Sequence, residues 1–233
     1  MTKSKYQKQI FPSFEYESEY RTQGIGLIAG IDEVGMGALA GPVVAGAVMF
    51  EIRNPKTLNP KQIINSKFKI QNEIVIRDSK AMTAKQREEA VEWIKTNALA
   101  WAVGEASVEE IDTINIRQAS HLAMRRAVDA LSVMPGLLLI DGNPAQPHTK
   151  IPAVNIIKGD QLCYSIAAAS IVAKVYRDKM MENFSRRFPG YDWESNKGYG
   201  SLSHKNALLD KGITVLHRKS YAPVAALAHK QYP

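Results

Sequence analysis

Two apolar runs joined by a glycine-rich turn occupy residues 24–50, which read GIGLIAGIDEVGMGALAGPVVAGAVMF. Small and β-branched apolar residues in such runs are typical of buried strands, and closely spaced glycines are typical of a turn. The only charged residues of the segment, Asp32 and Glu33, stand where the first run meets the turn. The pattern therefore predicts two strands around a turn, with two adjacent carboxylates at the end of the first strand.

Strand and helix patterns alternate after this segment. Apolar residues spaced i, i+3 and i+4 indicate helices, whereas short alternating or continuous apolar runs indicate strands. In chain order the predicted elements are a loop at 55–69, a helix capped by Thr83, a strand at 99–103, a helix with its buried stripe at 116–130, strands at 137–140 and 154–157, a helix at 165–188, a short helix at 203–210 and a last helix after Pro223. Such interleaving predicts the α/β class with a mixed sheet.

The helix at 165–188 is the longest predicted element. Its alanines allow close packing on one side, and its basic residues are expected to face elsewhere. These basic residues are Lys174, Arg177, Lys179, Arg186 and Arg187. Asp178, which stands between two of them, is expected to be their solvated partner rather than a site residue.

Length and composition place the chain among ordinary globular proteins. With 233 residues it is expected to form one large domain, or one domain with a small appendage. A content of 45% hydrophobic and 23% charged residues argues against a disordered or fibrous chain. Lys and Arg number 30 against 23 Asp and Glu, which gives a formal net charge of +7. This excess favours a polyanionic partner without identifying one.

Cysteine usage and hydropathy bear on the cellular setting. Cys163 is the only cysteine, so neither an intramolecular disulfide nor a multi-cysteine metal site is possible. Met1–Tyr20 lacks the apolar core of a signal peptide, and no apolar run approaches the roughly 20 residues of a membrane helix. We expect a cytoplasmic protein that makes no membrane contact.

Four acidic residues lie where apolar strand patterns end, namely Asp32, Glu33, Asp141 and Asp160. Ligands of open α/β sheets bind at strand ends, so these side chains are candidates for one site. A single aspartate at such a position more often serves a turn or caps a helix. Two carboxylates about 4 Å apart repel by about 4 kcal/mol at an effective dielectric of 20, so a cluster of four requires cations.

The residue types indicate which cations and which chemistry. Ligand sets made only of oxygen favour Mg²⁺ or Mn²⁺, and two such ions about 3.5 to 4 Å apart are the known apparatus for in-line displacement at phosphorus. Gly35 and Gly37 leave room for a sugar-phosphate chain to approach the backbone, although a plain tight turn is the simpler explanation of the glycines alone. The acidic pattern therefore points to phosphodiester chemistry.

Residues 30–42, GIDEVGMGALAGP, resemble the opening signature of ribonuclease HII. Further blocks resemble this family in the same order and cover most of the chain from Phe14 to about Val224; they are 78–80, 107–131, 141–143, 158–160 with 165–178, 197–199 and 217–220. The resemblance implies a ribonuclease H-like fold, with a five-stranded mixed sheet flanked by helices and a helical C-terminal part. It divides the chain into an N-terminal extension (1–24), a catalytic core (25–190) and a helical substrate-gripping segment (191–233). The extension is either a helix packed on the sheet or an arm.

The resemblance also implies an activity. An enzyme of this family would hydrolyse the RNA strand of RNA/DNA hybrids and cut 5′ of ribonucleotides embedded in duplex DNA, leaving 5′-phosphate and 3′-hydroxyl ends. Asp32, Glu33, Asp141 and Asp160 match the family's catalytic and metal-binding acids, with Mg²⁺ or Mn²⁺ as the cofactor. The expected partners are these nucleic acids, and the protein is expected to be a monomer.

Contacts to the substrate are implied for residues outside the acidic set. Tyr199 matches the tyrosine that packs on a deoxyribose beside the scissile site, although without the family match ordinary core packing is the better explanation. Gly35, Met36 and Gly37 match the segment that reads the ribose 2′-hydroxyl. The family usually carries arginine where Met36 stands, and a thioether does not replace a guanidinium.

Two lysines and three histidines complete the set of candidates. Lys80 and Lys174 lie in matched blocks and are expected to contact phosphates, although most lysines are merely solvated. His148, His204 and His217 lack the spacing of metal ligands, and His217 is expected to be structural or directed at a phosphate. Cys163 is expected to fill a small space in the core.

Three other functions remain open from the sequence. The protein would then be a hybrid-binding protein without catalysis, another metal-dependent nuclease or transferase of the same fold, or a ribonuclease HIII, whose usual extra N-terminal domain has no room here. The four acids argue against the first alternative. Magnesium-dependent nicking of a hybrid, and the position of the cut, would discriminate among all of them.

Overall fold

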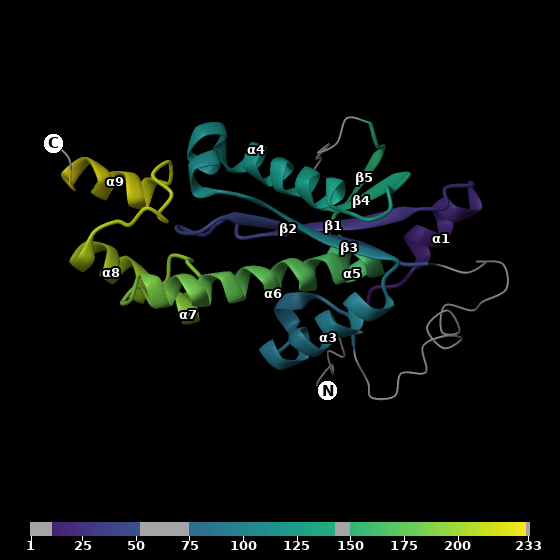
Figure 1. The fold of residues 1–233 in the computed structure, drawn as a ribbon, viewed down its shortest axis with the longest axis horizontal. Coiled ribbons are helices and arrows are strands. Elements are labelled where there is room, and N and C mark those ends of the chain that lie inside the picture. Colours follow the sequence, from purple (N-terminus) through teal and green to yellow (C-terminus); the bar gives the residue numbers. More distant parts are fainter. Residues whose placement is uncertain (1–10, 52–74, 143–149, 232–233) are drawn as a thin grey trace, which may run out of the picture.

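The computed structural model describes residues 11–51, 75–142 and 150–231. The predicted loop at 55–69, Asn143 and His148 lie outside the described residues, as do the first ten residues of the extension. In chain order the elements are α1 (Glu15–Thr22), β1 (Ile28–Val34), β2 (Val43–Met49), the 3-10 turn η1 (Ser79–Ala81), α3 (Ala84–Asn97), β3 (Ala100–Ala106), α4 (Val108–Asp129), β4 (Leu137–Asp141), β5 (Ala153–Ile156), α5 (Gly159–Leu162), α6 (Tyr164–Arg187), α7 (Trp193–Asn196), α8 (Leu202–Lys211) and α9 (Ala222–Gln231). Figure 1 shows α4 and α6 on opposite faces of the sheet, with α8 and α9 at the end away from α1.

The sheet has the strand order β3-β2-β1-β4-β5. β2 pairs antiparallel with β1 and β3, whereas β4 pairs parallel with β1 and β5. The predicted five-stranded mixed sheet flanked by helices is therefore confirmed. In the β1–β4 register Ile31 lies opposite Ile140. The next residue of each strand is an aspartate, so Asp32 and Asp141 lie on neighbouring strands at the same edge.

The predicted strand pair forms the centre of the sheet because it is apolar on both faces. Ala47 and Met49 of β2 pack into the core on the α4 side, whereas Val48 packs into the core on the α6 side. The two-residue period of a strand produces this alternation. β2 is buried along its whole length as a result.

α6 lies very close to the sheet. Its first half is lined by buried alanines, as the sequence predicted. A Cβ atom at Gly30 on β1 would lie 2.1 Å from the carbonyl carbon of Ser165, so only glycine lets the helix backbone approach the strand this closely. The helix ends at Arg187, before Pro189, and reaches from the middle of the sheet to the C-terminal helices (Figure 1).

Reciprocal hydrogen bonds cap the first turn of each of the two other long helices, α3 and α4. The Thr83 hydroxyl accepts from the Gln86 N–H at 3.2 Å, and the Gln86 side chain accepts from the Thr83 N–H at 2.9 Å, which confirms the predicted cap. Ser107 and Glu110 form the same arrangement at the start of α4. α4 begins before the predicted stripe and is interrupted at Asn115, whose φ is 67°.

α1 is a helix packed against the core, which confirms the first of the two expectations for the extension over its described residues. Glu17 is completely buried, and its Oε1 accepts from the Ser165 N–H at 2.9 Å and from the Cys163 thiol at 3.2 Å. Burial raises the pKa of the Glu17 carboxyl. The carboxyl group thereby joins α1 to the beginning of α6, and Cys163 is the buried core residue that the sequence predicted.

The C-terminal part is helical, as expected, and has an apolar core of its own. Trp193, Leu208 and Val224 are buried in it together with Met181 from the end of α6 and Leu39 from the turn after β1. The turn between β1 and β2 is therefore packed against the C-terminal helices. Among the described residues, no helix combines the length and the apolar content needed to cross a bilayer.

Candidate nuclease active site

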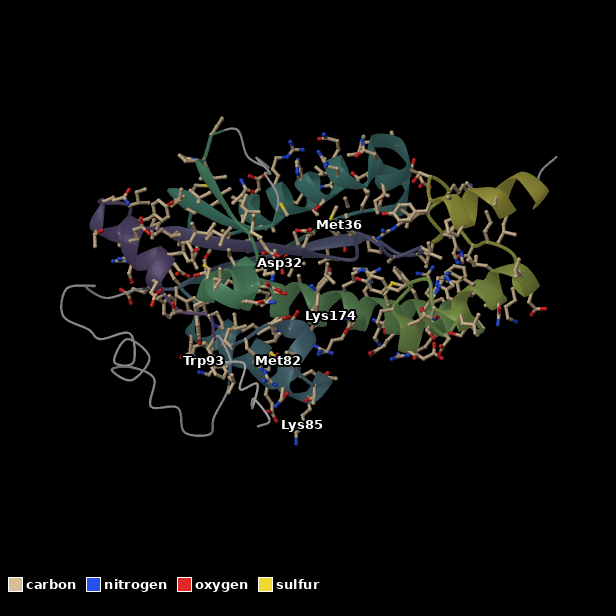
Figure 2. The ribbon with its side chains drawn as sticks, turned by 180° about the vertical axis from the view of Figure 1, so that it is seen from behind. Asp32, Met36, Met82, Lys85, Trp93 and Lys174 are labelled. Carbon is tan, nitrogen blue, oxygen red and sulfur yellow. The ribbon has the colours of Figure 1, made fainter. Side chains whose placement is uncertain are left out.

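The ends of β1 and β4 and the short helix α5 carry the four predicted acids, which we call the acidic centre: Asp32, Glu33, Asp141 and Asp160. The structure brings them within electrostatic range of one another. The pKa of Asp32 is raised well above its ordinary value, first by burial and then by the negative charges of the other three carboxylates. Figure 2 shows Asp32 on β1, between the sheet and α6.

Glu33 and Asp160 have the same kind of environment. Burial raises the pKa of Glu33 to about 7, with a further contribution from Asp141. Burial also raises the pKa of Asp160, with contributions from Asp141 and Asp78. The positive charge of Lys80 opposes the shift in the pKa of both Glu33 and Asp160. Lys80 therefore lies beside the acidic centre, where it can meet a phosphate.

Hydrogen bonds orient several members of the site. Asp32 Oδ1 accepts from the Glu33 N–H at 2.7 Å, and Asp141 Oδ1 accepts from the Gly159 N–H at 2.6 Å. The Ser170 hydroxyl on α6 is hydrogen-bonded to Asp32 and lies 3.0 Å from the Ser79 hydroxyl. Sequence reasoning missed both serines and the acidic neighbour Asp78, although Asp78 and Ser79 stand in a matched block. Their only signal was that position, because serine and aspartate are also common at caps and turns.

The acidic centre fits a hard divalent cation by its chemistry. All its donors are carboxylate oxygens, and a cation would relieve both their mutual repulsion and the cost of burying them. Among the described residues, no group of three or more His, Cys, Asp or Glu side chains is arranged to hold an ion in the conformation shown. One oxygen each of Asp32 and Asp141 is instead bonded to a backbone N–H.

The turn at 35–42, which we call the glycine loop, follows the acidic centre directly. Its first residue, Gly35, has a φ of +94°, a conformation that favours glycine. Met36 is 38% exposed, and its carbonyl oxygen accepts from Arg218 Nη1 at 2.9 Å and from the Tyr221 hydroxyl. A Cβ at Gly37 would meet no other atom, so the backbone there faces open space.

Tyr199 lies beside the glycine loop and is 37% exposed, so the alternative of ordinary core packing is wrong. The guanidinium of Arg177 lies over the Tyr199 ring, with Cζ 5.5 Å from the ring centroid. The Leu39 N–H donates to the Gly198 carbonyl at 2.8 Å and ties the loop to the turn that carries the tyrosine. An exposed aromatic ring is thus presented next to the glycine loop, where Tyr199 pairs with Ala38.

Two predictions for α6 are wrong. Arg177 does not face away from the packed side but is completely buried against the glycine loop. Asp178 is not a solvated partner of Arg177 and Lys179. Its side chain is 14% exposed, accepts from Lys174 Nζ at 2.6 Å and lies 3.9 Å from Arg87 Nη2. The difference arises because α3 and the glycine loop cover parts of α6 that the sequence pattern left to solvent.

A mixed sheet with desolvated carboxylates at adjoining strand ends defines a metal-dependent nuclease of the ribonuclease H type. Comparison with known proteins identifies the family within this class. The family model of ribonuclease HII matches residues 29–224, so the chain belongs to the ribonuclease HII family. It is accordingly a divalent-metal-dependent endonuclease for the RNA of RNA/DNA hybrids, which rules out both a protein without catalysis and a ribonuclease HIII.

Similar proteins agree with this assignment. The ribonuclease HII of Paracoccus denitrificans (strain Pd 1222) is 43% identical over 222 residues, which are 95% of this chain and 97% of the relative. The structure of ribonuclease H2 from Pyrococcus horikoshii OT3 has a TM-score of 0.68 at 20% identity and covers 88% of this chain and 98% of that one. The structure of Bst-RNase HIII in complex with Mn²⁺ has a TM-score of 0.62 at 18% identity, with coverage of 88% and 70%. At these identities the two structures support the fold.

Proposed function

We propose that the protein, besides acting on uniform hybrids, cuts 5′ of single ribonucleotides embedded in duplex DNA and leaves 5′-phosphate and 3′-hydroxyl ends. Asp32, Glu33, Asp141 and Asp160 are the catalytic residues of this proposal. The observation that carries it is the cluster of carboxylates whose pKa values rise through burial and mutual repulsion. Such a cluster opposes folding unless a bound cation offsets its charge, and carboxylates with pKa values perturbed in this way gather at functional sites.

The four acids would hold the cofactor, Mg²⁺ or Mn²⁺. When bound, these ions lower the pKa of a water and offset the charge that develops on the phosphate oxygens. The chain's own contribution is placement. The parallel pairing of β1 with β4 sets Asp32 beside Asp141, and the Gly159 N–H fixes one oxygen of Asp141. Lys80 would offset negative charge next to Glu33 and Asp160.

Substrate would lie along the surface from the acidic centre to Tyr199. Gly35, Met36 and Gly37 would approach the ribose through backbone groups, and Tyr199 would pack on the neighbouring deoxyribose. Lys80 and Lys174 would contact phosphates; Figure 2 shows Lys174 on α6, below Asp32. The segment 191–233 would grip the duplex, since its helices pack against the glycine loop. We propose that the enzyme works as a monomer on these nucleic acids.

Replacement of Asp141 by Asn tests the acidic centre, because it removes a charge and almost no volume. We expect cleavage of a uniform RNA/DNA hybrid in Mg²⁺ to fall by about 100-fold or more, with hybrid binding retained. Glu88→Gln, on the exposed face of α3, is the matched control and should cleave as the wild type does. Wild-type cleavage by the Asp141 variant would contradict the assignment.

The embedded-ribonucleotide activity needs its own substrate. A DNA duplex with one internal ribonucleotide should be cut on its 5′ side in Mg²⁺ or Mn²⁺, and the products should carry 5′-phosphate and 3′-hydroxyl ends. A uniform hybrid of the same length is the reference. Cleavage of the hybrid alone would restrict the enzyme to hybrids and contradict the proposal.

A further inference from the structure

Two completely buried guanidinium groups stand on either side of the glycine loop. The guanidinium of Arg177, from α6, donates to the carbonyl oxygens of Pro42 at 3.0 Å, Ala40 at 3.1 Å and Lys197 at 2.9 Å. Two of these acceptors belong to the glycine loop, and the third belongs to the turn that carries Tyr199. One side chain therefore joins the two segments that are proposed to contact the ribose and the deoxyribose.

Arg218 binds the same loop from the C-terminal part. Its Nε donates to the Gly41 carbonyl at 2.9 Å, and its Nη1 donates to the Met36 carbonyl at 2.9 Å. Nη1 also donates to the Tyr221 hydroxyl at 3.1 Å, and that hydroxyl donates to the Met36 carbonyl as well. The backbone of Met36, next to the proposed ribose contact, is thus held by two side chains.

This arrangement is costly for a purely structural element. No ion pair among the described residues involves either guanidinium. Their partners are carbonyl oxygens, the Tyr221 hydroxyl and the faces of the Tyr199 and Tyr221 rings. Buried charges without a counter-ion oppose folding, and apolar side chains of similar volume would fill the same space without that cost. Arginine is the side chain whose rigid fork of donors holds several carbonyls at once.

The glycine loop packs closely against Arg177. A Cβ at Gly35 would lie 2.3 Å from Arg177 Nε. Arg177 also stands two helical turns, or about 10 Å, beyond Ser170 on α6, and Ser170 is hydrogen-bonded to Asp32. The helix α6 therefore helps to position both the acidic centre and the glycine loop.

We propose that Arg177 and Arg218 are positioning residues that lock the glycine loop and the Tyr199 turn into one rigid unit, and that this rigidity sets the discrimination between an embedded ribonucleotide and a uniform hybrid. The proposal rests on the proposed function of the glycine loop and Tyr199. Neither arginine contacts the substrate in it; both act by fixing the backbone that does. Loosening either one should weaken binding of the ground state more than it slows the chemical step.

The test uses Arg218→Lys, Arg177→Lys and Tyr221→Phe in the full chain. Lysine keeps the charge but loses the fork, and Tyr221→Phe removes only one hydroxyl, so it should fold even where a buried arginine is indispensable. Arg21→Lys is the control, because Arg21 also donates to a backbone carbonyl, that of Gly26, but from α1, at the end of the molecule away from the C-terminal helices (Figure 1). KM and kcat are measured on both substrates, and amide hydrogen exchange is followed at Leu39, Ala40 and Gly41.

We expect KM for the embedded ribonucleotide to rise about 10-fold in the arginine variants and about 5-fold in Tyr221→Phe. The rise in KM on the uniform hybrid should be smaller, and so should the change in kcat. The three loop amides should exchange faster. Arg21→Lys should change none of these. If the wild type does not cut the embedded ribonucleotide, the proposed function fails, while loop exchange and KM on the hybrid still test the positioning role. Unchanged loop exchange, or faster exchange with KM unchanged on both substrates, would overturn it.

Discussion

At the scale of single residues, Met36 stands where the resemblance to ribonuclease HII implies an arginine. Its side chain is partly exposed, whereas its carbonyl is fixed by Arg218 and Tyr221. Because this carbonyl already accepts two hydrogen bonds, the proposed backbone recognition of a ribose would use other backbone groups of the glycine loop. In that proposal, what the thioether lacks relative to arginine is a charged hydrogen bond to the substrate.

Met36→Arg should raise the affinity for an embedded ribonucleotide about 10-fold or more, because one charge-assisted hydrogen bond is worth about 1.5 to 3 kcal/mol. The metal dependence should stay the same, since the acidic centre is separate from this side chain. Kd and cleavage are measured on both substrates in an Mg²⁺ series. Met134→Arg, at an exposed methionine remote in sequence, controls for added charge. A loss of activity, or an equal gain in both variants, would refute the argument.

At the scale of elements, the sequence predicted most of the helices and strands, because apolar residues recur with the period of the element that they form. β1, β2, α3 and α6 all lie where apolar spacing placed them. The single-turn helices α5 and α7 were missed, since four residues carry too little periodicity. Arg177 was misplaced for a different reason: its partners are carbonyls far away along the chain, and no local pattern reports them.

The start of α6 depends on a similar distant partner, Glu17 of α1. Glu17→Ala would leave the Ser165 N–H and the Cys163 thiol without their acceptor, so we expect a loss of about 2 to 4 kcal/mol in the free energy of unfolding. Glu17→Gln, which keeps an acceptor oxygen and removes the buried charge, should lose less. Urea unfolding measures both. Glu15→Ala, on the exposed side of the same helix, is the control, and an equal effect of both alanines would refute the anchoring role.

At the scale of the whole molecule, the candidate site was more predictable than its supports. Strand ends meet at one edge of a sheet, so Asp32 and Asp141 were expected together, and the β1–β4 register places them side by side. His217 is structural, which is one of the two roles that the sequence allowed. The buried positions of Arg177 and Arg218 and the partners of the histidines were not predicted, because these contacts join distant segments of the chain. The sequence therefore indicates the groups for catalysis better than the framework that holds them.

A buried chain of hydrogen bonds joins the C-terminal helices to the Tyr199 turn. His204 Nδ1 lies 2.9 Å from the Tyr199 carbonyl and must donate to it, which leaves His204 Nε2 to accept from Trp193 Nε1 at 3.1 Å and from His217 Nε2 at 3.0 Å. His217 Nδ1 in turn accepts from the Thr214 N–H at 2.8 Å. Both imidazoles are thus neutral, and a proton added to either would face an existing donor.

Acid should therefore weaken the fold through these histidines. Burial, with His204 nearby, lowers the pKa of His217 to about 3, whereas an unfolded histidine takes up its proton near pH 6.5. Between these values the unfolded state binds more protons, so the stabilisation is complete above about pH 6.5 and is lost toward pH 3, at about 1.4 kcal/mol per pH unit for each proton.

The acidic centre has raised pKa values and contributes with the opposite sign. The difference between the wild type and His217→Gln in metal-free urea unfolding cancels that contribution, since both proteins keep the four acids. This difference should be largest at pH 7.5 and shrink toward pH 4.5, and a constant difference would mean that His217 does not titrate with folding.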